Sequence, residues 1–361
     1  QRQMCIRDRS TTTHVMESTG KNYAKLMQIF SLIPNSMQYE PNDQIGIPWD
    51  LNKIAQLLFF IALSATVVAL ICARTKAKRW WTGGLGLLLS AVLLTGYFIP
   101  VSVPVMDLSA ASETADTTYY GMNYKDCQKD EAADFRVKKY QLDFSVGLNL
   151  TGRAKVYVDR SELKSYRFTL YHGYKVKQVT DQTGAALDFR REYDYVTVTR
   201  GGAAVEYLCL EYTGKSPKYY SSYAGVCLPA NFAYYPIPGY RELFKDNFYG
   251  FIDCSLPYDT AFDVRCSGRK QMYCNLAARG DNHFAGNARS ITLLSGYYDT
   301  LKLNDTLVVY PKYADGEIQA RVKKNMGTFT KEHRDIHTIF IMDADNLTPY
   351  EPVSYTHLTL P

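Results

Sequence analysis

The chain has 361 residues, of which 46% are hydrophobic, and its 41 lysines and arginines against 36 aspartates and glutamates give a formal net charge of +5. This length allows two domains. The small basic excess does not favour a nucleic-acid partner, because four of the basic residues lie between two apolar segments, where membrane topology accounts for them. Tyrosine is frequent, at 30 residues, which indicates a β-rich part.

Both ends of the sequence resemble translated sequencing-adapter ends, at residues 1–10 and 353–361. We therefore expect a fragment that is cut at both ends, and we exclude these residues from fold reasoning. An N-terminal flank outside the cell would need a signal or an earlier helix, so we also expect at least one missing upstream membrane helix.

Residues 11–53 are predicted to form an extracytoplasmic flank with a short amphipathic helix. The segment Tyr23–Pro34 has a broad apolar face and ends at a proline. This helix either lies in the plane of the membrane interface or packs as an ordinary extracytoplasmic helix. The sequence leaves both interpretations open.

Two uncharged apolar segments follow, at 54–73 and 82–103. A helix of about 20 residues crosses a bilayer core of about 30 Å, and each segment reaches that length. The turn between them, 74–81, carries four basic residues and two tryptophans, which places it on the cytoplasmic side. We predict a transmembrane hairpin at 54–103 in a multi-pass protein of the cell membrane, with residues 104–352 extracytoplasmic. The alternative is a pair of buried helices in a soluble protein.

Small residues lie on one side of the second segment, at Gly83, Gly84, Gly86 and Ser90. Small side chains let helices approach closely in lipid. This pattern predicts contact with further transmembrane helices of the same or a partner chain. Alternatively, glycine is simply common in membrane helices.

Residues 104–134 are polar and are interpreted as a linker, and 135–312 as a β-domain. Alternate apolar residues from Tyr140 to Leu150 predict the clearest strand. Turn signals at Thr183-Gly184, Gly201-Gly202 and Gly214 separate further short strands, which favours an antiparallel sandwich or open barrel. The other predicted strands contain Ala154–Val158, Phe168/Leu170, Val196/Val198, Val205–Tyr212, Phe262–Cys266, Met272–Leu276, Ile291–Leu294 and Thr306–Tyr310.

The pattern changes near Tyr313. Helical spacing over Glu317–Phe329, with Asp315 as the expected cap, precedes a short apolar strand at Thr338–Met342. A helix followed by such a strand predicts the start of an α/β or α+β unit at 313–352.

The candidate chemistry is sparse. His333 and His337 are spaced i, i+4, as in a zinc-peptidase helix, but Arg334 stands where that motif needs a glutamate, so we favour a solvated loop. The acids Asp343 and Asp345 are interpreted as turn residues. Six cysteines could form disulfides in any of 15 connectivities, although we favour buried thiols. These cysteines are Cys127, Cys209, Cys227, Cys254, Cys266 and Cys274.

One loop resembles a known family. The segment Val226–Gly239 contains Tyr234-Tyr235-Pro236, which resembles the aromatic pair and proline closing the N-terminal β-domain of HExxH zinc aminopeptidases related to aminopeptidase N. The segments Leu210–Gly214, Val264…Asn275 and Ile291…Tyr298 resemble other strands of that domain, so the likeness covers about Phe135 to Tyr310.

Joined to an upstream membrane hairpin, the pattern resembles permease subunits of bacterial ABC-type exporters that carry an external aminopeptidase-like domain. The resemblance implies a cytoplasmic ATPase partner, a peptide-like substrate, and a zinc ion only in a missing downstream domain. The family's HExxH pair, third glutamate ligand and GxMEN-type strand have no match here. We therefore assign no catalytic, cofactor-binding or metal-binding residue, and expect this fragment to be inactive. The alternatives are a membrane-anchored binding or sensor module without catalysis and an unrelated membrane-anchored surface protein.

Overall fold

The computed structural model describes residues 51–96, 111–216, 218–223, 225–245, 250–304, 306–312, 319–320, 322–324, 326–327 and 338–341. They belong to two compact units, a helical unit and a β-rich unit. The expected amphipathic helix at 23–34, both adapter-like ends, His333, His337, Asp343 and Asp345 lie outside the described residues.

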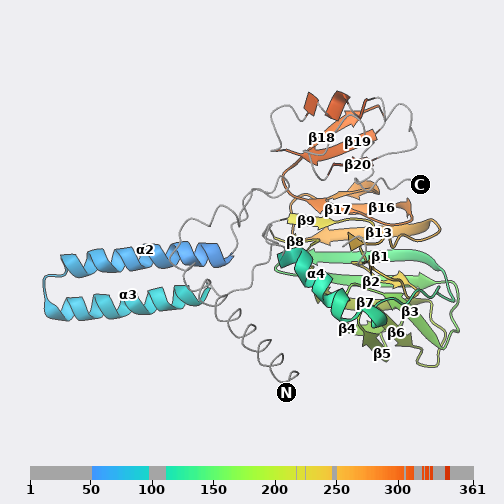
Figure 1. Ribbon diagram of the computed structural model, residues 1–361, viewed down its shortest axis with the longest axis horizontal. Coiled ribbons are helices and arrows are strands. Elements are labelled where there is room, and N and C mark those ends of the chain that lie inside the picture. Colours follow the sequence, from blue (N-terminus) through green and yellow to red (C-terminus); the bar gives the residue numbers. More distant parts are fainter. Residues whose placement is uncertain are drawn as a thin grey trace, which may run out of the picture. The chain divides into compact units, whose positions relative to one another are not determined.

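The helical unit is a hairpin of α2 (Leu51–Cys72) and α3 (Lys76–Gly96), which lie side by side (Figure 1). Within the described residues, the segment Ile54–Cys72 is long and apolar enough to cross a membrane. The predicted turn at 74–81 is too long, because α3 already begins at Lys76. Thr75 Oγ1 accepts a hydrogen bond from the Lys78 amide (3.3 Å), and Arg79 Nε donates to the Ala73 carbonyl (3.0 Å). The Thr75 hydroxyl therefore caps the start of α3 and the Arg79 side chain caps the end of α2, while Arg74 lies in the short loop between the helices.

The small-residue side of α3 packs within the hairpin. A Cβ at Gly86 would overlap the hydroxyl and methyl groups of Thr66, and one at Gly83 would lie 3.2 Å from Leu70. Ser90 is buried, whereas a Cβ at Gly84 would meet nothing within 4 Å. Three of the four small residues thus lie on the buried side of α3, where Gly83 and Gly86 let α2 approach closely.

The centre of the β-rich unit is a seven-stranded sheet with the order β15-β16-β13-β1-β2-β7-β4. Its strands are β1 (Val137–Val146), β2 (Leu150–Val158), β4 (Tyr174–Thr180), β7 (Tyr207–Gly214), β13 (Thr260–Ser267), β15 (Ala277–Gly280) and β16 (His283–Ala288). The pairing of β1 with β13 is parallel, whereas the other neighbours are antiparallel. The sheet is therefore mixed, and the expectation of a purely antiparallel architecture is wrong in this respect.

Smaller sheets complete the β-rich unit, which agrees with the predicted all-β class. One has the order β10-β3-β6-β5, the second has the order β14-β17-β9-β8, and β11 pairs with β12. Their bounds are β3 (Ser165–Thr169), β5 (Phe189–Glu192), β6 (Tyr195–Thr199), β8 (Ser221–Ser222), β9 (Gly225–Leu228), β10 (Ile237–Pro238), β11 (Phe244–Lys245), β12 (Gly250–Phe251), β14 (Tyr273–Cys274) and β17 (Leu293–Ser295).

The strand predicted over Tyr140–Leu150 is in fact a hairpin. β1 ends at Val146, β2 begins at Leu150, and the exposed Leu148 lies in the turn between them. Val146 and Leu150 are register partners, and paired residues face the same side of a sheet. The alternation therefore continues through the turn and conceals it. The turns at Gly184 and Gly202 are confirmed, with φ of +86° and +104°, but Gly214 is the last residue of β7.

The predicted linker at 104–134 contains a helix, α4 (Ala111–Met122), followed by the 3₁₀ turn η1 (Tyr124–Asp126). Tyr120 of α4 is part of the hydrophobic core of the β-rich unit. Threonine and tyrosine are weak helix formers, so composition indicated a linker, whereas burial of the tyrosine favours the helix.

The boundary predicted between 312 and 313 divides a sheet. β18 (Tyr298–Leu303) pairs with β19 (Thr306–Pro311), which pairs in parallel with β20 (Thr338–Phe340). Residues 319–320, 322–324 and 326–327 are helical, and Val322 and Met326 share a core cluster with Val308 and Ile339. The predicted helix and strand near the C-terminal end are confirmed for the described residues, but their α/β unit already starts at β18.

Candidate functional site

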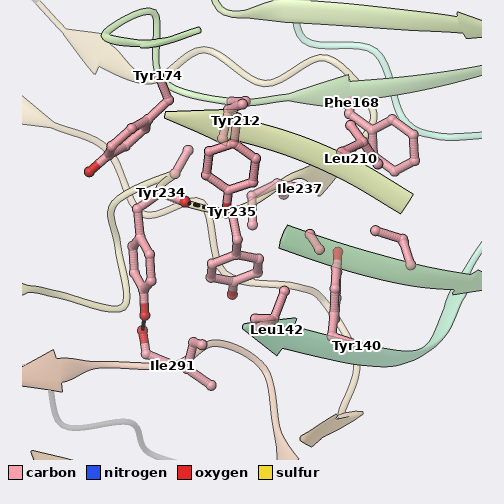
Figure 2. Packing of buried hydrophobic residues seen from close by; sticks show 14 of the residues in the cluster. Tyr140, Leu142, Phe168, Tyr174, Leu210, Tyr212, Tyr234, Tyr235, Ile237 and Ile291 are labelled. Carbon is pink, nitrogen blue, oxygen red and sulfur yellow. Dashed lines mark hydrogen bonds between the residues drawn. The ribbon is translucent and has the colours of Figure 1, made fainter. Parts of the chain in front are cut away.

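The loop that carries the family resemblance lies inside the core. Tyr234 and Tyr235 are fully buried (Figure 2). The hydroxyl of Tyr212 donates to the Tyr234 carbonyl (2.9 Å), and that of Tyr234 donates to the Ile291 carbonyl (2.8 Å) (Figure 2). The Tyr140 hydroxyl donates to the carbonyl of Pro236 at 2.8 Å. These bonds join the loop to three separate segments, so the loop closes the core.

A buried cluster of ionisable side chains is the strongest candidate site among the described residues. His172 lies between two carboxylates, with Nδ1 3.4 Å from Asp194 Oδ1 and Nε2 3.8 Å from Asp116 Oδ1. The side chain of Asp194 is fully buried, that of Asp116 is 3% exposed and that of His172 is 18% exposed. The Tyr171 hydroxyl donates to Asp116 Oδ1 at 2.6 Å. We call Asp116, Tyr171, His172 and Asp194 the carboxylate–histidine cluster.

Three segments far apart in the sequence build this cluster. Asp116 comes from α4, Tyr171 and His172 follow β3, and Asp194 lies in the turn between β5 and β6. The backbone fixes that turn, because the Leu170 amide donates to the Asp194 carbonyl (2.8 Å) and the His172 amide donates to Asp194 Oδ1 (2.7 Å). Asp194 therefore belongs to the β-rich unit whether or not α4 is docked.

Aromatic rings of α4 cover the cluster. The Tyr119 ring stacks on the imidazole of His172, with ring centroids 3.5 Å apart. The Tyr120 ring stacks on Phe244 at 4.8 Å and meets the edge of Phe251 at 6.2 Å. Because residues i, i+3 and i+4 share one face of a helix, Asp116 and both tyrosines meet the β-rich unit together.

The electrostatics of the cluster are those of a desolvated site. Burial raises the pKa of Asp116, although the hydrogen bond from Tyr171 and the charge of His172 act in the opposite direction. Burial lowers the pKa of Arg191, whose guanidinium donates to the carbonyls of Leu170 and Tyr171, both at 2.9 Å. Two carboxylates thus share an environment with one guanidinium and one imidazole.

This arrangement is suited to holding α4 rather than to acid–base catalysis. A general acid or base must come within hydrogen-bonding distance of its substrate, but α4 itself covers both carboxylates. Sequence reasoning missed the cluster, because its residues are scattered and Asp116 lay in an apparent linker. The one available signal was the spacing of Asp116, Tyr119 and Tyr120, which matches one helix face.

No group of three or more histidine, cysteine, aspartate or glutamate side chains in the described part of the chain could hold a metal ion.

The six cysteines of the β-rich unit are buried and free. Burial raises the pKa of Cys227, Cys254 and Cys274 to about 12 in each case. The thiolate is the reactive form, so these side chains behave as small apolar groups.

The outer faces of the hairpin are apolar and exposed. Ile61 of α2 is 55% exposed, and Leu85 and Leu88 of α3 are 69% and 63% exposed. The tryptophans at the start of α3, Trp80 and Trp81, are more than four-fifths exposed. A helix in water usually buries its apolar stripe against other parts of the protein.

No family model matches the sequence, and no curated protein matches it. Among solved structures, it is similar to a mutant M1 zinc metallopeptidase from Deinococcus radiodurans bound to a Tyr-Ser-Ala substrate, at 13% identity and a TM-score of 0.33, over 56% of each chain. It is also similar to leukotriene A4 hydrolase from Saccharomyces cerevisiae, at 11% identity and a TM-score of 0.38, over 60% of this chain and 38% of that one. A third is yeast LTA4 hydrolase in complex with bestatin, at 12% identity and a TM-score of 0.41. The chain thus spans between 38% and 56% of the length of these structures.

Proposed function

We propose that this chain anchors an aminopeptidase-like β-domain to a lipid bilayer, with the α2–α3 hairpin in the membrane and the β-rich unit outside the cytoplasm. The observation that carries the proposal is the distribution of side chains on the hairpin. Leucine, isoleucine and valine side chains face outward, and small residues lie between the helices. Such packing is typical of membrane helices, because association in lipid depends on close contact and not on burial of apolar surface.

In this proposal the basic start of α3 faces the cytoplasm. Lys76, Lys78 and Arg79 lie next to Trp80 and Trp81, which combines a basic cytoplasmic end with an aromatic belt. The β-rich unit follows α3 in the chain and is then extracytoplasmic. The finer proposal is that the hairpin belongs to an ABC-exporter permease with a cytoplasmic ATPase partner, which rests on the sequence resemblance.

In this proposal the β-rich unit binds a substrate or shapes the cleft that holds it, and does not itself cleave bonds. Its resemblance to the N-terminal β-domain of zinc aminopeptidases rests on the order of its segments and on Tyr234-Tyr235-Pro236. In the whole protein, this domain would lie next to a downstream zinc peptidase domain and handle a peptide-like substrate. The alternative is a binding or sensor module without catalysis.

Membrane topology can be tested by cysteine labelling of the full chain in intact cells. Thr75→Cys in the basic turn and Leu148→Cys in the exposed β1–β2 turn are placed in a background that carries Cys5→Ser and Cys72→Ser. A maleimide that cannot cross membranes should label Leu148→Cys and miss Thr75→Cys until the cells are permeabilised. The reverse pattern would invert the topology, and recovery of the chain in the soluble fraction would contradict the membrane anchor.

Catalysis is tested separately on the purified full chain. Aminoacyl substrates should be hydrolysed no faster than in a blank reaction, with or without added zinc. Activity that a chelator abolishes and zinc restores would contradict the non-catalytic role. The downstream reading frame then separates the two alternatives, because an HExxH motif followed by a glutamate ligand supports a peptidase and its absence supports a binding module.

A further inference from the structure

The seven-stranded sheet has one apolar face and one polar face. Its apolar face carries buried core residues such as Leu142, Val156 and Leu210. Side chains alternate between the two faces along a strand, and register partners share a face. We call the polar side of β1, β2, β7, β13 and β16 the outer face. Its residues are Lys139, Gln141, Asp143, Ser145, Thr151, Arg153, Lys155, Tyr157, Tyr207, Cys209, Glu211, Thr213, Ala261, Asp263, Arg265, Ser267, His283, Ala285 and Asn287.

The composition of the outer face indicates what kind of partner it fits. Its side chains are charged, polar or small, apart from two tyrosines, and all of them except Cys209 are exposed or half-buried. Protein–protein interfaces have an apolar core, and lipid tails need an apolar surface. Among these described residues, the outer face has no aliphatic side chain larger than alanine. It therefore fits a polar ligand.

Two tyrosines and two lysines gather at one end of the outer face. Lys139 is the register partner of Tyr157, which is in turn the partner of Tyr207. The two tyrosine rings lie 4.9 Å apart, and the Tyr157 hydroxyl donates to Gln141 Oε1 (3.0 Å). Lys139 Nζ lies 6.0 Å from the centre of the Tyr157 ring, and Lys155 Nζ lies 5.4 Å from that of Tyr207. We call these two tyrosines and two lysines the tyrosine–lysine strip.

The acids of the outer face have other cationic neighbours. Arg153 Nε lies 3.4 Å from Glu211 Oε1, and His283 Nε2 lies 2.9 Å from Asp263 Oδ1. The third acid, Asp143, has an arginine as register partner on each side. Within the described residues, neither lysine of the strip belongs to an ion pair. The two ammonium groups are therefore available to an anionic ligand.

We propose that the tyrosine–lysine strip binds an acidic polysaccharide, with sugar rings against the tyrosines and carboxylates on the lysines. A sugar ring presents C–H groups on its flat side and hydroxyls at its edge, which suits the amphipathic tyrosine ring and the amide of Gln141. Each ammonium lies close to a ring, so a carboxylate that pairs with it brings its own sugar to the aromatic surface.

The choice of a polysaccharide rests on the proposed function for the location of the β-rich unit. Single-stranded nucleic acid also combines rings with negative charges, and it binds to aromatic and basic side chains on sheets. A unit outside the cytoplasm meets polysaccharides instead. The proposal names the ligand class of the β-rich unit as a binding module and requires no catalytic step.

The test is fluorescence anisotropy with a labelled hexamer of galacturonic acid and the purified full chain in detergent micelles. We expect saturable binding that weakens as the salt concentration rises, because salt screens exposed charges. Maltohexaose, which has neutral rings, and hexaglutamate, which has carboxylates without sugar rings, should each bind about tenfold more weakly or less. The proposal is overturned if the hexamer does not bind, if hexaglutamate binds equally well, or if single-stranded DNA binds more tightly.

Matched variants assign the binding to the strip. Lys155→Ala and Tyr207→Leu should each weaken binding by about tenfold, whereas Lys155→Arg and Tyr207→Phe keep the charge and the ring and should bind nearly as the wild type does. Lys302→Ala and Tyr124→Ala change exposed residues away from the outer face and should leave binding unchanged. Circular dichroism confirms that each variant is folded. Equal binding by wild type, Lys155→Ala and Tyr207→Leu would overturn the proposal.

The cysteine labelling of intact cells separates this proposal from the proposed function. If Leu148→Cys is labelled from outside and the hexamer does not bind, the polysaccharide proposal fails and the membrane topology stands. If Leu148→Cys is not labelled until the cells are permeabilised, the extracytoplasmic location fails, and the choice of a polysaccharide fails with it.

Discussion

The hairpin and the β-rich unit use apolar side chains in opposite ways. In α2 and α3 the large aliphatic side chains face outward and glycines lie between the helices. In the β-rich unit the large side chains face inward, and eight of the twelve largest fully buried ones are tyrosines. Some of these tyrosine hydroxyls bond to backbone carbonyls, as in Tyr140, Tyr212 and Tyr234. Water favours the burial of apolar surface, whereas the lipid environment that we propose for the hairpin would not.

The largest effect should come from the aromatic core. Phe232 contacts the rings of Tyr171, Tyr174, Tyr219, Tyr234 and Phe251. We expect Phe232→Ala to lower the free energy of unfolding of the β-rich unit by about 3–5 kcal/mol, because it leaves a cavity. Urea denaturation followed by near-ultraviolet circular dichroism measures this. The control, Leu148→Ala in the exposed turn, should change it by less than about 0.5 kcal/mol.

In the hairpin, the association of the two helices should be weakened by a larger side chain at the helix contact, not by a smaller one. Gly86→Ala places a methyl group against Thr66 and should cost about 1–3 kcal/mol in helix association. Gly84→Ala is the matched control, because its methyl group meets nothing within 4 Å. Fluorescence of Trp80 and Trp81 during titration of micelles with a denaturing detergent reports the difference. Equal behaviour of the two variants would contradict the close contact of α2 with α3.

Hydroxyl groups in the core can be tested by a second matched pair. Tyr234→Phe removes the bond to the Ile291 carbonyl and should lower the free energy of unfolding by about 1 kcal/mol. The hydroxyl of Tyr235 has no hydrogen-bond partner among the described residues, so Tyr235→Phe should be neutral or slightly stabilising. Because both variants keep the aromatic ring, the reverse order would contradict a stabilising hydrogen bond between Tyr234 and the Ile291 carbonyl.

The smallest effect concerns the thiols. Burial holds the pKa of Cys227, Cys254 and Cys274 at about 12, so at pH 8 the thiolate is a very small fraction of each. In detergent micelles, Cys72 at the exposed end of α2 should react with a maleimide within minutes, while the three buried cysteines react only after unfolding. Mass spectrometry of tryptic peptides measures the labelling. Rapid labelling of a core cysteine in the folded protein would contradict the burial of these thiols.

Periodicity predicted the long elements, because their patterns are set locally. The apolar run 54–73 became α2, and the alternations at 154–158 and 262–266 became β2 and β13. Two-residue strands such as β8, β10 and β11 were not predicted, because two residues show no period and neighbouring strands define them. The break at Leu148 was missed because the alternation continues across the paired ends of β1 and β2.

By itself the sequence determined which segments are apolar, how long they are and with what period they repeat, since these follow from the order of the side chains. Only the tertiary structure showed that the apparent linker contains a helix, in which Tyr119 and Tyr120 lie. It also showed that Gly83 and Gly86 face α2. It also brought Asp116, His172 and Asp194 together from three distant segments. The physical reason is that the energy of burial and of charge pairing depends on distance in space, which the local order of residues does not specify.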